Sequence, residues 1–210
     1  MDKAKQKVQQ FRDREQAILD AALQLMLDHG EENVTVEQIA EAVDIGKGTI
    51  YKHFSSKSEI YIRLMFDYEL QVKDKLTAAI AKAEQGDYAA PARCYFESRI
   101  SDPVRYRLFM RLEERLVQLG DQKEKLEELD KIRRDIMSIF NDVMSKRIAE
   151  GLVKDYPPYF YYAAYWALTQ GAVDLYTSPI FEGVIDDMEG LMKFIMEMGV
   201  HMGQFPPKAP

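Results

Sequence analysis

Residues 47–54 place several hydrogen-bonding side chains on one short stretch, Lys-Gly-Thr-Ile-Tyr-Lys-His-Phe. Ile50 and Phe54 lie four positions apart, so on a helix they share one face and would anchor it inward. The outward side chains carry ammonium, hydroxyl and imidazole groups that can donate to base edges, and Gly48 would let the backbone approach a partner closely. The stretch therefore offers nucleic-acid recognition chemistry at Lys47, Gly48, Thr49, Tyr51, Lys52 and His53.

Two short helices around a tight turn would hold this stretch in place. Thr35 can cap a helix whose apolar residues recur at helical spacing up to Val43. Asp44-Ile45-Gly46 then makes a three-residue turn into the basic stretch. Such a pair exposes its second helix to the major groove of DNA, so the spacing predicts a helix-turn-helix from about Thr35 to Phe54.

The net charge of −7 argues against nucleic acid only at first sight, because phosphates respond to the local arrangement of charge. Residues 45–58 contain three lysines and no acid. Lys57 precedes the next helix and is placed to meet a phosphate at a helix N-terminus. The N-terminal arm adds further cations, namely Lys3, Lys5, Lys7, Arg12 and Arg14.

The segment from about Ala17 to Leu64 resembles the tetracycline-repressor (TetR/AcrR) family of bacterial transcriptional regulators. The residues that carry the resemblance are Thr35, Ile39, Ala40, Ala42, Ile45, Lys47 to Tyr51, His53, Phe54 and Lys57. The resemblance implies that Lys47, Thr49 and Tyr51 work in the groove. It also implies phosphate contacts by Thr35, His53 and Lys57. Two positions depart from the family pattern, since Asp44 replaces a usual glycine and Gly46 a usual capping Ser or Thr.

The remainder of the chain also reads as helix, and no segment alternates apolar and polar residues as a strand would. The expected fold is all-α with about nine helices. Residues 1–56 would form the arm and helix-turn-helix domain, and a long helix from Lys57 would lead into an effector-binding and dimerisation domain over 57–204. Residues 205–210 would be a loose Pro-rich tail.

The last two helices are apolar on more than one side, so each must be covered on more than one side. In the resembled family they pair with their symmetry mates, which implies a homodimer. The interface expected on this basis contains Tyr162, Trp166, Ala172, Leu191, Ile195 and Met198. The alternative is that both helices are simply internal core.

An effector pocket is also expected from the resemblance, with mostly apolar walls and a few polar groups. Its candidate lining is Tyr95, Phe96, Arg99, Phe109, Met110, Glu113, Met137, Phe140, Tyr165 and Gln170. Taken singly, each aromatic residue or methionine is more often core than pocket. The aromatic and Met-rich lining favours an apolar or aromatic organic effector, and Arg99 is available to pair with a carboxylate if that effector is an acid.

Other function classes find little support in the sequence. The three histidines have no ligand spacing, so neither a metal nor a cofactor is expected, and the sequence contains no catalytic constellation. Cys94 is the only cysteine, the N-terminus lacks the apolar core of a signal peptide, and residues 156–173 are uncharged but too polar for lipid. These features favour a cytoplasmic bacterial protein without a membrane partner.

The function expected is that of a homodimeric repressor of a palindromic operator, released from double-stranded DNA by a small organic effector. An activator, or a regulator that needs its ligand in order to bind, is an alternative with the same fold. A helical scaffold and an enzyme are more remote alternatives.

Overall fold

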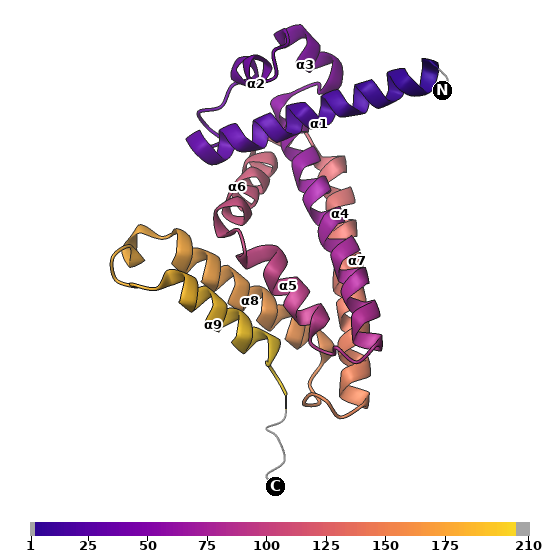
Figure 1. The fold of residues 1–210 in the computed structure, drawn as a ribbon, viewed down its shortest axis with the longest axis vertical. Helices are drawn as coiled ribbons and strands as arrows, with labels where there is room; N and C mark the ends of the chain where they lie inside the picture. Colours follow the sequence, from indigo (N-terminus) through magenta and orange to yellow (C-terminus); the bar gives the residue numbers. More distant parts are fainter. Residues whose placement is uncertain (1–2, 205–210) are drawn as a thin grey trace. The chain divides into compact units, whose positions relative to one another are not determined.

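The computed structural model describes residues 3–204, and over that range the chain is helical, as the sequence predicts (Figure 1). An isolated bridge pair joins Val153 and Gln204, and no strand is formed within these residues. The predicted loose tail, 205–210, lies outside the described residues. The elements are α1 (Lys3–His29), α2 (Val36–Ala42), α3 (Lys47–His53), α4 (Lys57–Glu84), α5 (Ala90–Ile100), α6 (Pro103–Leu119), α7 (Lys123–Ala149), α8 (Pro158–Thr177), the 3-10 turn η1 (Pro179–Phe181) and α9 (Met188–Val200).

Local sequence signals account for several helix boundaries. Gly30 has a φ of +81° just after α1 ends, a conformation that favours glycine. Asp102 accepts a hydrogen bond from the Arg105 amide at 3.0 Å, and Pro103 occupies the first position of α6. Ser56 Oγ accepts one from the Glu59 amide at 3.1 Å in the first turn of α4. These two caps mark the starts of α6 and α4, and the long helix predicted from Lys57 begins at that residue.

The chain divides into two compact units. Unit 1 comprises residues 1–68 and 108–127, and unit 2 comprises 69–107 and 128–210. Helices α4, α6 and α7 each contribute residues to both units. The predicted domain boundary at residue 57 follows chain order, whereas these two units interleave along the chain. The boundary stays a prediction.

Unit 1 has its core where α1, α2 and α3 meet the first turns of α4. The buried side chains from the first helices include Ile18, Met26, Ile39 and Ile50. α1 packs on α2 and α2 on α3, which gives the helix-turn-helix its base.

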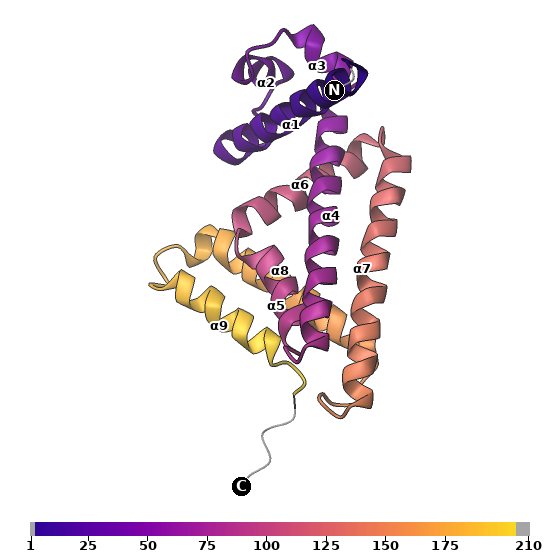
Figure 2. The same ribbon diagram turned by 45° about the vertical axis from the view of Figure 1, so that its right-hand side comes forward.

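Unit 2 has a second core, in which α5 packs on both α8 and α9 (Figure 2). The close approach of α9 to α5 depends on Gly199, since a Cβ at that position would lie 2.1 Å from the Phe96 ring. Residue spacing in the sequence does not specify what Gly199 approaches. The structure shows that its partner is inside the same chain.

Candidate nucleic-acid interface

Helix α3 is held by its apolar side and presents its polar side to solvent. Ile50 and Phe54 are each 1% exposed, whereas the Tyr51 side chain is 47% exposed. Lys47 and Lys52 are exposed as well. The predicted split is therefore present for Ile50 and Phe54 on one side and for Lys47, Tyr51 and Lys52 on the other, whereas Thr49 and His53 are half-buried.

The turn before α3 tolerates both departures from the family pattern. Asp44 has a φ of +52°, a left-handed conformation that Asp accepts more readily than most residues. Gly46 stands at the N-cap of α3 without a side-chain cap, a loss of only a few tenths of a kcal/mol. Thr35 forms a capping box with Gln38, which confirms the predicted cap of α2.

Gly48 is exposed on α3, and a Cβ there would meet nothing within 4 Å in the described chain. Internal packing therefore places no demand for glycine at this position. The open space is compatible with the close approach to DNA that the sequence predicts.

Lys47 forms an ion pair with Glu37 of α2, and both side chains are largely exposed. The hydrogen bond from Lys47 lowers the pKa of Glu37, and the same bond raises the pKa of Lys47. Lys47 Nζ also lies 5.8 Å from the centre of the Tyr51 ring. A phosphate would have to compete with Glu37 for this ammonium group.

Lys57 is half-buried, and its ammonium group donates to the Glu31 carbonyl at 2.8 Å. Tyr61 OH donates to the same carbonyl at 3.3 Å, and the Glu31 carboxylate lies 3.3 Å from Arg111. Burial lowers the pKa of Lys57. Sequence spacing placed Lys57 at a phosphate but did not reveal this structural role, because Glu31 lies in a different loop.

His53 ends α3 and contacts Phe11 of α1, with 4.1 Å between the two ring centres. Its Nδ1 is buried and has no hydrogen-bonding partner among the described residues. This ring contact ties the N-terminal part of α1 to the end of α3. Thr49, also predicted to work in the groove, is half-buried.

Five of the ten residues expected to line an effector pocket meet in unit 2. The Tyr95 ring centre lies 6.1 Å from Phe140 and 5.8 Å from Tyr165, and the Arg99 guanidinium is 4.3 Å from it. Phe96 packs on Tyr165 at 5.0 Å. All five side chains are at least 95% buried.

The carboxylate of Glu69, which the sequence did not predict as a site residue, lies in this cluster. Glu69, which is 5% exposed, lies 2.9 Å from Arg133 Nε and 4.0 Å from Arg99 Nη2. Burial raises the pKa of Tyr106, which also hydrogen-bonds to Arg99. One sequence signal was available, because Glu69 occupies a position in the apolar stripe that α4 continues at Val72.

Several buried polar atoms of unit 2 are incompletely satisfied within residues 3–204. Tyr95 OH, Asn141 Oδ1 and Gln170 Oε1 have no hydrogen-bonding partner there, and neither does Glu69 Oε2. Such groups are costly unless something pairs with them. They are the features of unit 2 that most resemble a ligand site.

The other predicted pocket residues are not all brought to this cluster. Phe109, Met110 and Glu113 belong to unit 1, where the ring centres of Phe109 and Tyr68 are 4.8 Å apart. Met137 is half-buried in unit 2.

The expected interface residues divide into two groups. Trp166 and Met198 are 51% and 55% exposed, and so could meet a partner. Ala172 and Ile195 belong to the core of unit 2, at 1% and 8% exposed, and Tyr162 and Leu191 pack against that core. The sequence analysis did not single out Phe194, which is 56% exposed on α9.

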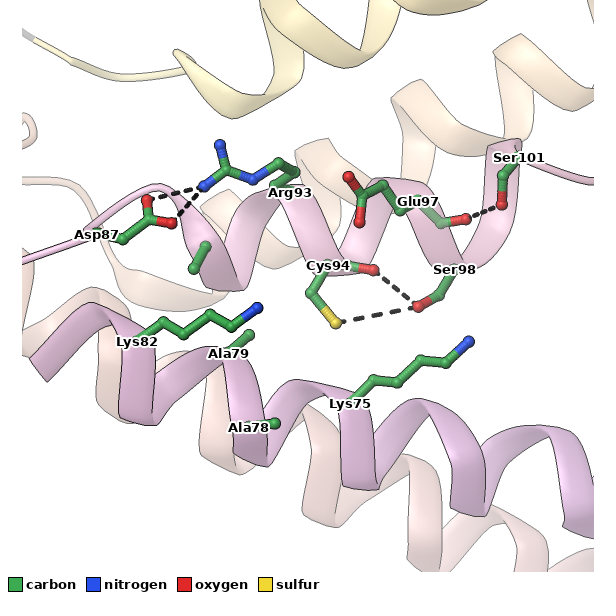
Figure 3. Close-up of a pocket in the computed structure, with 11 residues that line it drawn as sticks. Lys75, Ala78, Ala79, Lys82, Asp87, Arg93, Cys94, Glu97, Ser98 and Ser101 are labelled. Atoms are coloured by element: carbon green, nitrogen blue, oxygen red, sulfur yellow. Dashed lines mark hydrogen bonds and ion pairs between the residues drawn. The ribbon is translucent and has the colours of Figure 1, made fainter. Parts of the chain in front are cut away.

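A separate groove lies between α4 and α5 in unit 2, with a volume of about 530 Å³ (Figure 3). Lys75 and Lys82 extend from α4 toward α5, and Arg93 pairs with Asp87 across 2.7 Å. Cys94 lines the groove, half-buried, with Sγ 4.0 Å from Ser98 Oγ. Burial raises the pKa of this thiol, which therefore lacks the thiolate character of a reactive cysteine.

An exposed, lysine-bearing second helix on an apolar anchor defines a helix-turn-helix protein with an all-α fold. Residues 18–64 match the model of bacterial regulatory proteins of the tetR family. The transcriptional regulator TcmR of Streptomyces glaucescens is 51% identical over 49 residues, which are 23% of this chain and 21% of TcmR. The negative regulator of the biofilm operon IcaR of Staphylococcus aureus is 39% identical over 54 residues, 24% of this chain and 29% of IcaR.

Solved structures extend the likeness in fold beyond this segment. A tetR-family regulator from Rhodococcus RHA1 superposes with a TM-score of 0.68 at 17% identity, over 91% of this chain and 97% of that one. The ketosteroid regulator KstR2 of Mycobacterium tuberculosis gives 0.67 at 16%, over 92% and 96%. The helix-turn-helix segment is therefore similar to the tetR family of bacterial regulatory proteins, and the chain has the fold of solved members of that family.

None of the helices within residues 3–204 is both long and apolar enough to cross a membrane. In the same range, no three His, Cys, Asp or Glu side chains gather in a way that could hold a metal ion.

Proposed function

We propose that the protein is a transcriptional repressor that binds a palindromic DNA operator as a homodimer and leaves it when a small organic effector binds. The observation that carries the DNA-binding step is α3, whose lysines and Tyr51 face solvent while Ile50 and Phe54 are buried. Lys47, Thr49 and Tyr51 would contact base edges, and Thr35 and His53 would meet phosphates.

The proposed DNA step predicts a specific salt-dependent complex. Operators can be selected from a random duplex library and the affinity then measured by band shift across a salt series. A regulator should prefer the selected duplex to random DNA by at least about 10³-fold, with half-sites about 34–36 Å apart. Equal affinity for both duplexes would contradict the proposal.

The proposed dimer uses the exposed apolar side of α8 and α9. Trp166, Phe194 and Met198 are each more than half exposed, and α8 packs directly on α9. Apolar surface of this kind is typical of interfaces between copies of one chain. Two-fold symmetry would then give each half of a palindrome its own α3.

The proposed effector site is the cluster around Tyr95. The Arg99 and Arg133 guanidinium groups both face the buried carboxylate of Glu69, and Arg133 also pairs with the exposed Asp130 at 3.6 Å. Arg99, which lies over the Tyr95 ring, is 4.0 Å from Glu69, so we expect an anionic group to bind beside it better than a cation. Tyr95, Phe140 and Tyr162 surround this point with aromatic rings whose centres lie 5.7 to 6.1 Å from one another. An aromatic carboxylate therefore fits the proposed site best.

Helix α4 provides a physical route from this site to the DNA-binding unit, because it carries Glu69 and begins at Lys57 beside the helix-turn-helix. An effector carboxylate that attracts Arg99 away from Glu69 would weaken the ion pair that links α4 to α5. The ligand can release the operator only if it binds the released arrangement of the protein more tightly than the DNA-binding arrangement. A tenfold difference in affinity between the two corresponds to about 1.4 kcal/mol.

The effector step can be tested with benzoate, 1-naphthoate and their neutral amides. The carboxylates should raise the melting temperature and weaken operator binding more than the amides do. The matched variant Tyr95→Phe removes only a hydroxyl that has no partner among the described residues, so it should fold normally and bind the carboxylate less well. Equal effects of acids and amides would contradict the anionic class.

A further inference from the structure

Helix α1 is longer than its packing requires. All residues from Lys3 to Arg14 are exposed, and the first buried residue of the helix is Ile18. This exposed part of α1, residues 3–14, is called here the basic extension. Its cations are Lys3, Lys5, Lys7, Arg12 and Arg14, and its one acid, Asp13, accepts a hydrogen bond from Gln9 at 2.7 Å.

The ring contact between Phe11 and His53 places the basic extension beside the end of α3. The two ring centres are 4.1 Å apart, although Phe11 remains 47% exposed. The first turns of α1 then continue past α3 within unit 1 (Figure 1). A duplex that lies on the exposed side of α3 would therefore pass close to these turns.

Helix geometry separates the cations into two groups. Lys7 and Lys3 precede Phe11 by four and eight residues, which turns them by only about 40° and 80° from the face that meets His53. At a rise of about 1.5 Å per residue they lie about 6 and 12 Å beyond the ring contact. Arg14, three residues after Phe11, is turned by about 60° to the same side as Lys3 and Lys7. Lys5 and Arg12 are turned by about 120° and 100° to the other side.

We propose that the basic extension is a second DNA-contact surface, in which Lys3 and Lys7 bind backbone phosphates next to the groove that α3 reads. This inference rests on the proposed function and adds to it a contact that carries no base information. Charge complementarity supports it, because the face that continues from α3 has three cations, Lys3, Lys7 and Arg14, and no acid. These contacts would strengthen binding to every duplex and make it more sensitive to salt.

The test compares two double variants of the full chain with the same change in charge, Lys3→Gln with Lys7→Gln and Lys5→Gln with Arg12→Gln. Gln is nearly as good a helix former as Lys and Arg, so helix content and melting temperature should stay unchanged. Affinity for the selected operator and for random duplex is measured across a salt series, with any purification tag at the C-terminus.

The Lys3/Lys7 variant should flatten the dependence of log affinity on log salt by about two units per protomer for both duplexes, since each phosphate contact contributes about 0.9. The Lys5/Arg12 variant should keep a slope close to that of the unchanged chain. Equal slopes for the two variants, whether changed or not, would overturn the proposal. Absence of DNA binding by the unchanged chain would instead count against the proposed function itself.

Discussion

Lys57 Nζ donates a hydrogen bond to the main-chain carbonyl of Glu31 at 2.8 Å and thereby joins the first turn of α4 to the loop after α1. Tyr61 shares that acceptor, and Arg111 of α6 reaches the Glu31 carboxylate. The loop between α1 and α2 is therefore fixed from two other helices. Lys57, which the sequence predicts at a phosphate, therefore also helps to hold the DNA-binding unit together.

Lys57→Met should lower both stability and DNA affinity. The lost hydrogen bond is worth about 1–2 kcal/mol, because its donor is charged and half-buried. Lys52→Met is the matched control on exposed α3 and should lower DNA affinity alone. Chemical denaturation and band shifts on both variants make the comparison, and unchanged stability in Lys57→Met would refute the structural role.

Gly48→Ala should separate folding from recognition. The added methyl group meets nothing in the described chain, and alanine is the better helix former by up to about 1 kcal/mol. We therefore expect equal or higher thermal stability together with at least about tenfold weaker operator binding, equivalent to about 1.4 kcal/mol. Operator affinity equal to that of the unchanged chain would mean that DNA does not approach this position.

Acid should weaken unit 1 through Glu59. Burial raises the pKa of Glu59, but hydrogen bonds from Lys125 and Ser55 outweigh it and lower the pKa from 4.5 to about 2. A depressed folded-state pKa contributes stability above pH 4.5 that is lost as the pH falls toward 2. The difference in melting temperature between the unchanged chain and Glu59→Gln should accordingly be largest near neutral pH and shrink across that window. A difference that stays constant down to pH 2.5 would contradict the assignment.

Gly199→Ala should destabilise unit 2, because the new methyl would lie 2.1 Å from the Phe96 ring. Overpacking of this kind costs about 1–3 kcal/mol. Gly171→Ala at an exposed position of α8 is the control, because a Cβ there would meet nothing within 4 Å. This change should be neutral or stabilising by up to about 1 kcal/mol. Equal melting temperatures for the two variants would argue against the close approach of α9 to α5.

The proposed interface predicts different outcomes for exposed and buried positions. Trp166→Lys with Met198→Lys should leave the fold intact and yield monomers in analytical ultracentrifugation, with loss of operator binding. Ala172→Arg should unfold unit 2, because Ala172 is 1% exposed inside its core. Persistent dimers in the double variant would require another interface.

Much of the helix-turn-helix could be predicted because its determinants are local in sequence. Thr35 and Gln38 cap α2 three residues apart, and the four-residue spacing of Ile50 and Phe54 decides which side of α3 is buried. The left-handed conformation of Asp44 in the turn is likewise local, because it involves the backbone of one residue. Helical periodicity acts over the same short range, so the all-α fold was also accessible.

Only the tertiary structure decided what the helix faces touch. Glu31 and Lys57 are 26 residues apart, and nothing local in either segment signals the hydrogen bond between them. Phe11 and His53 likewise meet through the packing of α1 beneath α3. The structure also groups Phe109 with unit 1 rather than with the Tyr95 cluster.

Helix α8 shows the physical reason most clearly. Tyr165 and Trp166 are adjacent aromatic residues of α8 in a nearly uniform apolar run, yet they are 0% and 51% exposed. Amphipathic patterning specifies a face only when polar residues mark the opposite one, as they do on α3. On α8 no polar face opposes the apolar one, so the sequence determined only that the helix forms. Packing against α5 and α9 decided which of its aromatic side chains became core and which remained exposed.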